Sequence, residues 1–483
     1  MLFNSLDFAI FLPIVFSLYW LLNRRPIVWQ NTLLLVASYV FYGWWDYRFL
    51  GLIFLSTLVD FWAGLKIQAA TNRFHKRLFL AISLGVNLGM LAYFKYANFF
   101  IENFVEAFQI LGRPLSADSL SIILPVGISF YTFQTLSYTL DIYFRKTKPT
   151  HHFIDFAAFV SFFPQLVAGP IERASQLLPQ FSKRRVFDPI AATDGLRQIL
   201  WGLFKKMVIA DNAAILVNEV FAQPEAMNAS ALALGIIFFA FQIYGDFSGY
   251  SDIAIGTARL LGFSLMQNFA FPYFSRDIAE FWRRWHISLS TWFRDYLYIP
   301  LGGSRGTKFQ VIRNTFVIFL VSGFWHGANW TFVIWGFLHA IFFLPLLLTK
   351  RNRRHIDTVG GENNLPDLSE GIRMLITYSL VTFSWIFFRA ASLSEAFLYI
   401  EGLFSPTYFE LPSFTDLTKA FVLLITLTFM LLVEWFGRHN RHALERFGIN
   451  YPLAIRWGSY AFIFFLIMML HPSEASPFIY FQF

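Results

Sequence analysis

The sequence predicts an all-α, polytopic membrane protein. Of its 483 residues, 56% are hydrophobic and only 14% are charged, whereas soluble domains carry about 25% charged residues. The mean hydropathy is +0.51, and the apolar residues form runs that recur along the whole chain. We therefore expect one membrane domain over residues 1–483, and not a soluble domain with an anchor.

The apolar runs give the expected membrane spans in chain order. A simple crossing needs roughly 20 apolar residues, so we expect the shorter runs to be tilted, re-entrant or buried among other helices. The candidate spans are 8–22, 29–45, 49–69, 78–99, 120–143, 230–247, 311–324, 330–349, 373–388, 418–436 and 456–470.

Other stretches predict elements that do not cross. The run 153–169 is interrupted by proline and glycine, which favours a re-entrant or interfacial segment. Stretches 190–221 and 274–300 mix charge with large aromatics, a pattern typical of helices at the membrane interface or buried in a bundle. Gly85 and Gly89 are spaced as a small-xxx-small pair, which favours close helix packing.

Basic loops predict the orientation. Lys and Arg gather at 24–25, 73–77, 145–148 and in the hydrophilic loop 350–370, whereas the loop 100–119 leans acidic. Basic loops are enriched on the cytoplasmic side of membranes. We therefore expect the N-terminus and the loop 100–119 outside, with 350–370 as a cytoplasmic linker. No signal peptide is expected, because the first basic pair follows the first apolar run.

The composition excludes several kinds of site chemistry. The chain has no cysteine, which excludes disulfides, thiolate metal sites and a cysteine acyl intermediate. The histidines lack metal-ligand spacing, and the chain has no Gly-rich phosphate loop, so we expect neither a metal nor a bound cofactor. The net charge of +8 is dispersed between apolar runs, which favours contact with membrane lipids over nucleic-acid binding.

His326 is the strongest candidate for a catalytic residue. It lies in Ser322–Trp330, between the apolar runs Thr315–Val321 and Thr331–Leu348. An imidazole at membrane depth is costly, and a neutral imidazole can take the proton of a hydroxyl that attacks an acyl carbonyl. A structural histidine bonded to a neighbouring helix is the alternative. The orientation places His326 in a hairpin, in the membrane or toward the outer face.

The neighbours of His326 suggest a pocket. Trp325 and Trp330 can form apolar walls, and Gly327 allows another group to approach the backbone closely. Asn329 is a candidate donor to a developing oxyanion.

A second histidine, His286, lies in the basic and aromatic stretch 276–306, which is expected near the cytoplasmic side. Two interpretations of this stretch are open. Arg283, Arg284 and Arg294 can hold anionic lipid headgroups, or they can bind the phosphates of a cytoplasmic donor while His286 places the reacting group. A tunnel between the two histidines would let a donor enter from inside and an acceptor from outside.

Several polar residues beside or within the apolar runs favour a structural interpretation. Asp246 and Asp252 lie beside an apolar run, where carboxylate pairs can do acid–base work. We favour instead helix-end caps and buried partners of the arginines. His339 is expected to be a satisfied core histidine, with support of His326 as the alternative. For Asp60 the same two interpretations, a satisfied core residue and a supporting functional residue, are open.

Several segments stand out in order through most of the chain: 1–5, 124–134, 163–171, 244–252, 282–294, 298–303 and 322–329. Together they resemble the membrane-bound O-acyltransferase family, in its alginate O-acetyltransferase-like branch, with a teichoic-acid D-alanyl transfer protein as a more distant relative.

The resemblance implies a ring of tilted helices around a thin core, with funnels on both faces. It implies acyl transfer from a cytoplasmic thioester to a hydroxyl, with His326 as the catalytic histidine and His286 as the second important one. For this branch it implies acetyl-CoA as donor, an alginate-like polysaccharide as acceptor, an SGNH-hydrolase-like extracytoplasmic partner and the bacterial inner membrane. The alternatives are D-alanyl or other acyl transfer to teichoic acid, peptidoglycan or lipid, and a transporter or flippase that makes no bonds.

Overall fold

A computed structural model describes residues 1–112, 119–361, 365–472 and 477–481. Helices are the regular elements throughout these residues, as predicted. The chain forms two compact units, Met1–Gly195 with Ala254–Met266, and Leu196–Ile253 with Gln267–Phe483. The unit boundaries fall inside two helices, α10 (Pro189–Leu203) and α12 (Ala229–Leu260). The single domain expected from the sequence stays a prediction.

The first unit is built around three mutually packed helices, α3 (Leu50–Ala69), α4 (Arg73–Leu91) and α6 (Ile128–Tyr143). Buried polar groups join α3 to α4: Ser83 Oγ donates to Asp60 Oδ1 at 2.5 Å, and Asn87 Nδ2 donates to Asp60 Oδ2 at 2.9 Å. Asp60 is therefore a satisfied core carboxylate. The helices are α1 (Leu6–Leu21), α2 (Ile27–Asp46), α3 (Leu50–Ala69), α4 (Arg73–Leu91), α5 (Ala97–Ile110), α6 (Ile128–Tyr143), α7 (Phe153–Ser161), α8 (Phe163–Leu166) and α9 (Ala174–Phe181).

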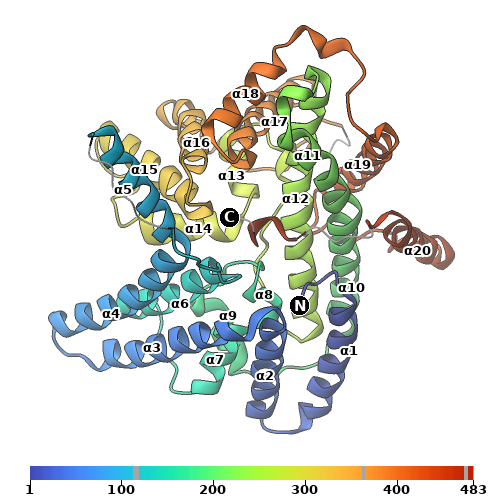
Figure 1. Cartoon of the computed structure of the whole chain (residues 1–483). Coiled ribbons are helices and arrows are strands. Elements are labelled where there is room, and N and C mark those ends of the chain that lie inside the picture. The colour runs from blue at the N-terminus through green and yellow to red at the C-terminus, as the bar shows by residue number, and fades with distance from the viewer. Residues whose placement is uncertain (113–118, 362–364, 473–476, 482–483) are drawn as a thin grey trace. The chain divides into compact units, whose positions relative to one another are not determined.

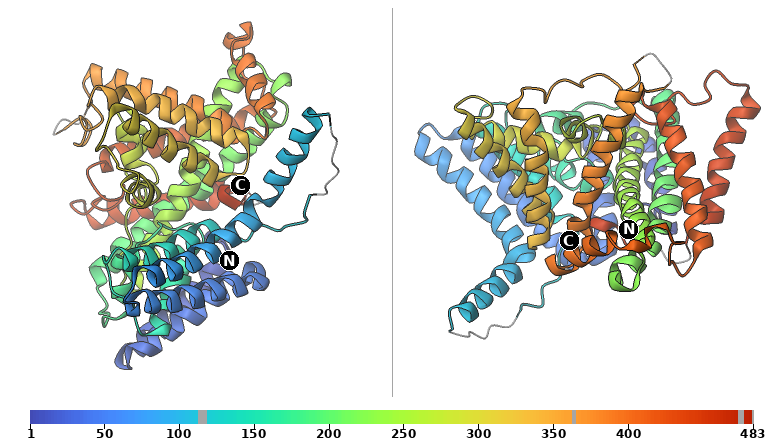
Figure 2. Two further views of the ribbon diagram at one scale, coloured as in Figure 1. Left: turned by 90° about the vertical axis from the view of Figure 1, so that its left-hand side faces the viewer. Right: turned by 90° about the horizontal axis from the view of Figure 1, so that it is seen from above.

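The helix α5 follows α4 after a π-helical turn, Ala92–Tyr96, and projects away from the other helices of its unit (Figures 1 and 2). The prediction of close packing at Gly85 and Gly89 is wrong. A Cβ added at either glycine would meet no atom within 4 Å, because this face of α4 is exposed.

The second unit contains the stretches that carry both candidate histidines. Helix α12, 32 residues long, is the longest of its helices and passes into the first unit at its end. The other helices are α11 (Asp211–Ala222), α13 (Ile278–Arg284), α14 (Ile287–Phe293), α15 (Lys308–His326), α16 (Trp330–Leu348), α17 (Leu368–Arg389), α18 (Leu393–Leu403), α19 (Leu417–Gly437) and α20 (Leu453–Leu470).

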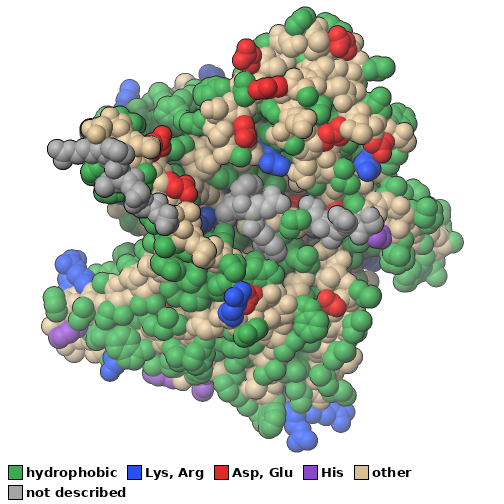
Figure 3. Space-filling view, viewed as in Figure 1, with side chains coloured by type: hydrophobic (Ala, Val, Ile, Leu, Met, Phe, Trp, Pro, Cys, Tyr) green, Lys and Arg blue, Asp and Glu red, His purple; other side chains and the backbone are tan. Residues whose placement is uncertain are grey.

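Eight helical stretches in the described residues are long and apolar enough to cross a membrane. Apolar side chains cover much of the surface in Figure 3, and those exposed on α20 include Phe464, Phe465 and Met469. Such a surface fits lipid and not water.

The predicted span 120–143 is wrong in its first part. Residues 120–127 are not helical, and α6 begins only after Gly127, whose φ is +74°. Nearly all of α6 is buried within the protein, so its apolar sequence reflects protein packing and not lipid contact. The stretch 153–169 contains α7 and α8 and is also buried, as allowed for a re-entrant segment.

Candidate active site

His326 is the last residue of α15, at the turn into α16. The two helices approach so closely that a Cβ on Gly323 would lie 2.2 Å from the carbonyl oxygen of Phe332. A Cβ on Gly327 would lie 2.0 Å from the Phe332 ring, which confirms the close approach expected there. This hairpin fixes the backbone that carries the imidazole.

Aromatic rings surround the buried imidazole of His326. The centroid distances are 4.9 Å to Trp325, 5.1 Å to Trp335, 5.3 Å to Phe388 and 5.6 Å to Tyr480. The predicted wall at Trp325 is thus present. Trp330 is not a wall, because it is half exposed at the start of α16.

His286 is fully buried between α13 and α14, with a left-handed backbone at φ 42°. Its Nδ1 lies 3.1 Å from Oδ1 of Asn268. That oxygen also accepts from the Ser288 N–H and hydroxyl, so it is an acceptor and the proton is on His286 Nδ1. Burial lowers the pKa of His286 to about 3. The ring is therefore a neutral Nδ1–H tautomer at physiological pH.

One indole, that of Trp325, contacts both histidines. Its centroid lies 6.0 Å from His286 and 4.9 Å from His326. Phe247 of α12 packs at 4.6 Å against His286 and at 4.6 Å against Tyr480, which in turn contacts His326. The sequence predicted one histidine toward each side of the membrane. The structure places both against one aromatic cluster.

A buried ion cluster lies next to Phe247. Lys206 Nζ pairs with Asp246 Oδ1 and with Asp211 Oδ1, both at 2.7 Å, and Lys205 Nζ pairs with Asp252 Oδ2 at 2.6 Å. Asp246 and Asp252 lie in the middle of α12. The prediction of helix-end caps paired with arginines is therefore wrong in position and partner, because both carboxylates lie inside the helix and pair with lysines.

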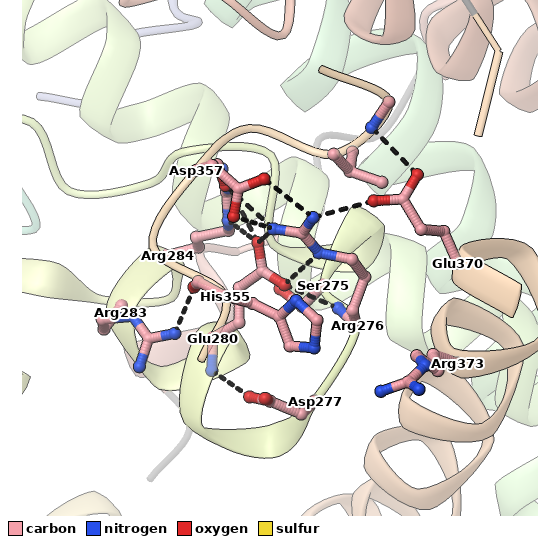
Figure 4. A network of polar contacts seen from close by, with 12 residues as sticks. Ser275, Arg276, Asp277, Glu280, Arg283, Arg284, His355, Asp357, Glu370 and Arg373 are labelled. Atoms are coloured by element: carbon pink, nitrogen blue, oxygen red, sulfur yellow. Dashed lines mark hydrogen bonds and ion pairs between the residues drawn. The ribbon is translucent and has the colours of Figure 1, made fainter. Parts of the chain in front are cut away.

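Two arginines of α13, Arg283 and Arg284, form hydrogen bonds to the segment 352–360 of the same unit (Figure 4). Arg283 donates to the carbonyl oxygens of Asn352 and His355 at 2.8 and 2.5 Å. Arg284 donates to Glu280 Oε1 and to the Asp357 carbonyl oxygen. The hydrophilic loop predicted as a linker is thus partly fixed in place.

Arg276 is the centre of this network. Its guanidinium bonds to the carboxylates of Glu280, Asp357 and Glu370, the last at 2.8 Å. Its side chain is buried, and a buried guanidinium needs such partners. We regard Arg276 as structural, and Arg283, which is exposed, as the accessible cation of this group.

Comparison with known proteins identifies the family. Residues 144–379 match the family described as "MBOAT, membrane-bound O-acyltransferase family". The chain is 44% identical over 409 residues to the probable alginate O-acetylase AlgI of Pseudomonas aeruginosa, covering 84% of this chain and 75% of the relative. It is 38% identical over 505 residues to the protein of the same name from Pseudomonas putida, covering 100% of both. The peptidoglycan O-acetyltransferase of Helicobacter pylori is 37% identical over 435 residues, 83% of this chain and 80% of the relative.

The chain belongs to the membrane-bound O-acyltransferase family. It is accordingly an O-acyltransferase and a multi-pass membrane protein, as the sequence predicted. The family match contains both His286 and His326.

Two other predicted site residues of this O-acyltransferase have identifiable contacts. Asn329 caps α16 by accepting from the Thr331 N–H at 3.0 Å, and its amide donates to the Ala391 carbonyl oxygen at 2.9 Å. This side chain is engaged in folding the hairpin, and an oxyanion role gains no support. Arg294 is exposed, and its Nε donates to Asp295.

His339 is a satisfied core histidine, as predicted. The Trp282 indole N–H donates to His339 Nδ1 at 3.2 Å, so the proton is on Nε2, which lies 3.0 Å from Ser384 Oγ. It contacts Trp335, the ring that also packs on His326.

Sequence reasoning missed Tyr480 and Lys206. The signal for Tyr480 was available: the chain becomes strongly aromatic again at 478–483, after the last apolar run. Lys206 could have been noticed as one of two adjacent lysines that have uncharged residues on both sides, at 198–204 and 207–210.

Proposed function

We propose that this O-acyltransferase moves an acetyl group from cytoplasmic acetyl-CoA to a hydroxyl of an exported or cell-surface polysaccharide. The observation that carries the proposal is the pair of buried histidines in contact with the indole of Trp325. The relatives are named as O-acetylases of alginate and of peptidoglycan, which supports acetyl as the acyl group and a polysaccharide as the final acceptor.

His326 is the proposed general base. Its imidazole takes the proton from the acceptor hydroxyl while the hydroxyl oxygen attacks the thioester carbonyl. The new C–O bond forms, the C–S bond breaks, and the proton passes from His326 to the departing thiolate. The surrounding rings exclude water, which would otherwise hydrolyse the thioester.

His286 is proposed to place the acyl end of the donor against Trp325. Its fixed tautomer and its packing on Phe247 suit a positioning role. A group whose pKa is about 3 is a poor base near pH 7, because the ideal catalytic pKa lies near the working pH. His286 is therefore not proposed as the base.

The donor's phosphates are proposed to bind Arg283, Arg284 and Arg294. Guanidinium groups pair with phosphate through parallel N–H donors. Arg283 and Arg294 are exposed, whereas Arg284 is committed to the buried carboxylate of Glu280. The first two carry most of this proposal. Acetyl-CoA is a substrate here, and no bound cofactor or metal is proposed.

The acceptor side is proposed to face the outside of the bacterial inner membrane. There a hydroxyl of an extracytoplasmic SGNH-hydrolase-like acetyltransferase would be the acceptor that attacks the thioester, and this partner would then pass the acetyl group to a hydroxyl of an alginate-like polymer. D-Alanyl transfer, and transfer to teichoic acid, peptidoglycan or lipid, are alternatives that keep the same chemistry and change the acyl group or the acceptor.

The proposal is tested with purified protein in liposomes supplied with acetyl-CoA, the partner and the polysaccharide. Free CoA thiol is measured with a colorimetric thiol reagent, and the enzyme gives no background because it has no cysteine. Thiol release that depends on the acceptor is expected. A transporter or flippase would release none, and release only from a D-alanyl-loaded carrier protein would identify the D-alanyl alternative.

A further inference from the structure

We propose that Asp246 is a positioning residue that holds the C-terminal segment, residues 477–481, against His326. The inference rests on the proposed catalytic role of His326, and it assigns to Asp246 a task beyond packing. Asp246 does not touch the imidazole. It acts through the backbone of Ile479.

The decisive contact is a hydrogen bond between a buried carboxylate and a backbone amide. The Ile479 N–H donates to Asp246 Oδ2 at 2.6 Å. The other oxygen, Oδ1, pairs with Lys206 Nζ at 2.7 Å. The carboxylate thus holds the C-terminal segment with one oxygen and is itself fixed by a lysine with the other.

The need to neutralise Lys206 does not by itself explain why a second carboxylate, Asp246, lies beside it. Lys206 already pairs with Asp211 at 2.7 Å, and all three side chains are only 3–4% exposed. A second buried carboxylate beside one lysine is costly unless other donors stabilise it. The Ile479 amide is such a donor, and a hydrogen bond to a charged group is about twice as strong as a neutral one.

The anchored amide fixes the aromatic residues on both sides of it. Phe478 packs on Tyr250 at 4.9 Å, and Tyr480 packs on Phe247 at 4.6 Å and on His326 at 5.6 Å. Phe478 and Ile479 are fully buried. Releasing Ile479 from Asp246 would therefore move Tyr480 away from His326 and open one side of its aromatic enclosure.

The test is a double-mutant cycle with Asp246→Ala and Ile479→Pro. Proline removes the N–H donor and suits the first position of the short helix Ile479–Phe481. Ile479→Ala is the matched control, because it shortens the side chain and keeps the N–H. We expect Asp246→Ala and Ile479→Pro each to lower kcat roughly ten- to a hundredfold, with KM for acetyl-CoA nearly unchanged. The kcat of the double variant should be no lower than that of Asp246→Ala. If the kcat losses of the two single variants multiply in the double variant, the proposal is overturned.

A second measurement is independent of catalysis. Chymotrypsin should cut after Tyr480 faster in Asp246→Ala and Ile479→Pro than in the wild type or in Ile479→Ala. A purely structural Asp246, acting only through Lys206, would leave this protection unchanged, and that result would also overturn the proposal. Because protection does not require acyl transfer, a failure of the proposed function alone would leave this result intact.

Discussion

The phenol ring of Tyr480 lies 5.6 Å from the imidazole of His326, measured between ring centroids. The two residues are far apart in the sequence, yet Tyr480 is among the rings that enclose this histidine, together with Trp325, Trp335 and Phe388. The C-terminal segment 477–481 is therefore part of the candidate active site.

Replacing His326 with alanine should reduce acyl transfer by about 10²- to 10⁴-fold, the usual contribution of a general base. The protein should remain inserted, because α15 ends at this residue and alanine suits a helix end. The measurement is acceptor-dependent thiol release from acetyl-CoA. His151→Ala, at an exposed loop position, is the control and should keep full activity. Near-normal turnover in His326→Ala would remove the base from the mechanism.

The free energy of unfolding should fall as the pH is lowered, because of His286. Its pKa is about 3 in the folded protein and about 6.5 in an unfolded chain. Below about pH 6.5 the imidazole of His286 is protonated in the unfolded state and stays neutral in the folded state. Stability is therefore lost as the pH falls from about 6.5 toward 3. The loss approaches about 1.4 kcal/mol per pH unit for this group.

The variant His286→Asn isolates this effect, because asparagine does not titrate and tolerates the left-handed backbone at this position. Thermal unfolding in detergent at about pH 7.5 and about pH 5 should show a smaller acid-side loss for the variant than for the wild type. Equal losses would mean that the buried imidazole does not resist protonation.

The helices and the His326 hairpin could be predicted from local sequence, because apolar runs and the intervening Gly327 and Asn329 act over short distances. The meeting of Lys206, Asp246 and Ile479 could not be predicted, because it depends on tertiary contacts between distant segments. The error at Gly85 and Gly89 has a related cause. Small residues permit close packing, but their spacing does not say whether a neighbouring helix is present.

The orientation predicts which loops a reagent outside the cell can reach. A cysteine replacing Gln109, exposed near the end of α5, should react with an impermeant thiol reagent on intact cells, and one replacing Arg353 should not. Ser116 and Asn363, in the same two loops, lie outside the described residues. Because the chain has no cysteine of its own, any label reports the introduced site. If only Arg353→Cys is labelled, the predicted topology is reversed, and so are the sides assigned to donor and acceptor.

Arg283→Gln should weaken acetyl-CoA binding roughly ten- to a hundredfold, because a lost charge-assisted hydrogen bond costs on the order of 1.5–3 kcal/mol. Glutamine can still donate to the Asn352 or His355 carbonyl oxygens that Arg283 contacts. The measurement is titration of the purified variant with a non-hydrolysable acetyl-CoA analogue.

The control for this prediction is Arg77→Gln, an exposed arginine on α4, which should bind the analogue like the wild type. Added salt should weaken binding to the wild type more than to Arg283→Gln, since screening acts on the contact that the variant has lost. If the arginines only hold anionic lipid, Arg283→Gln and Arg294→Gln should lower the amount of inserted protein while the affinity stays the same. Wild-type affinity in both variants would remove this donor site and leave lipid anchoring as the role of these residues.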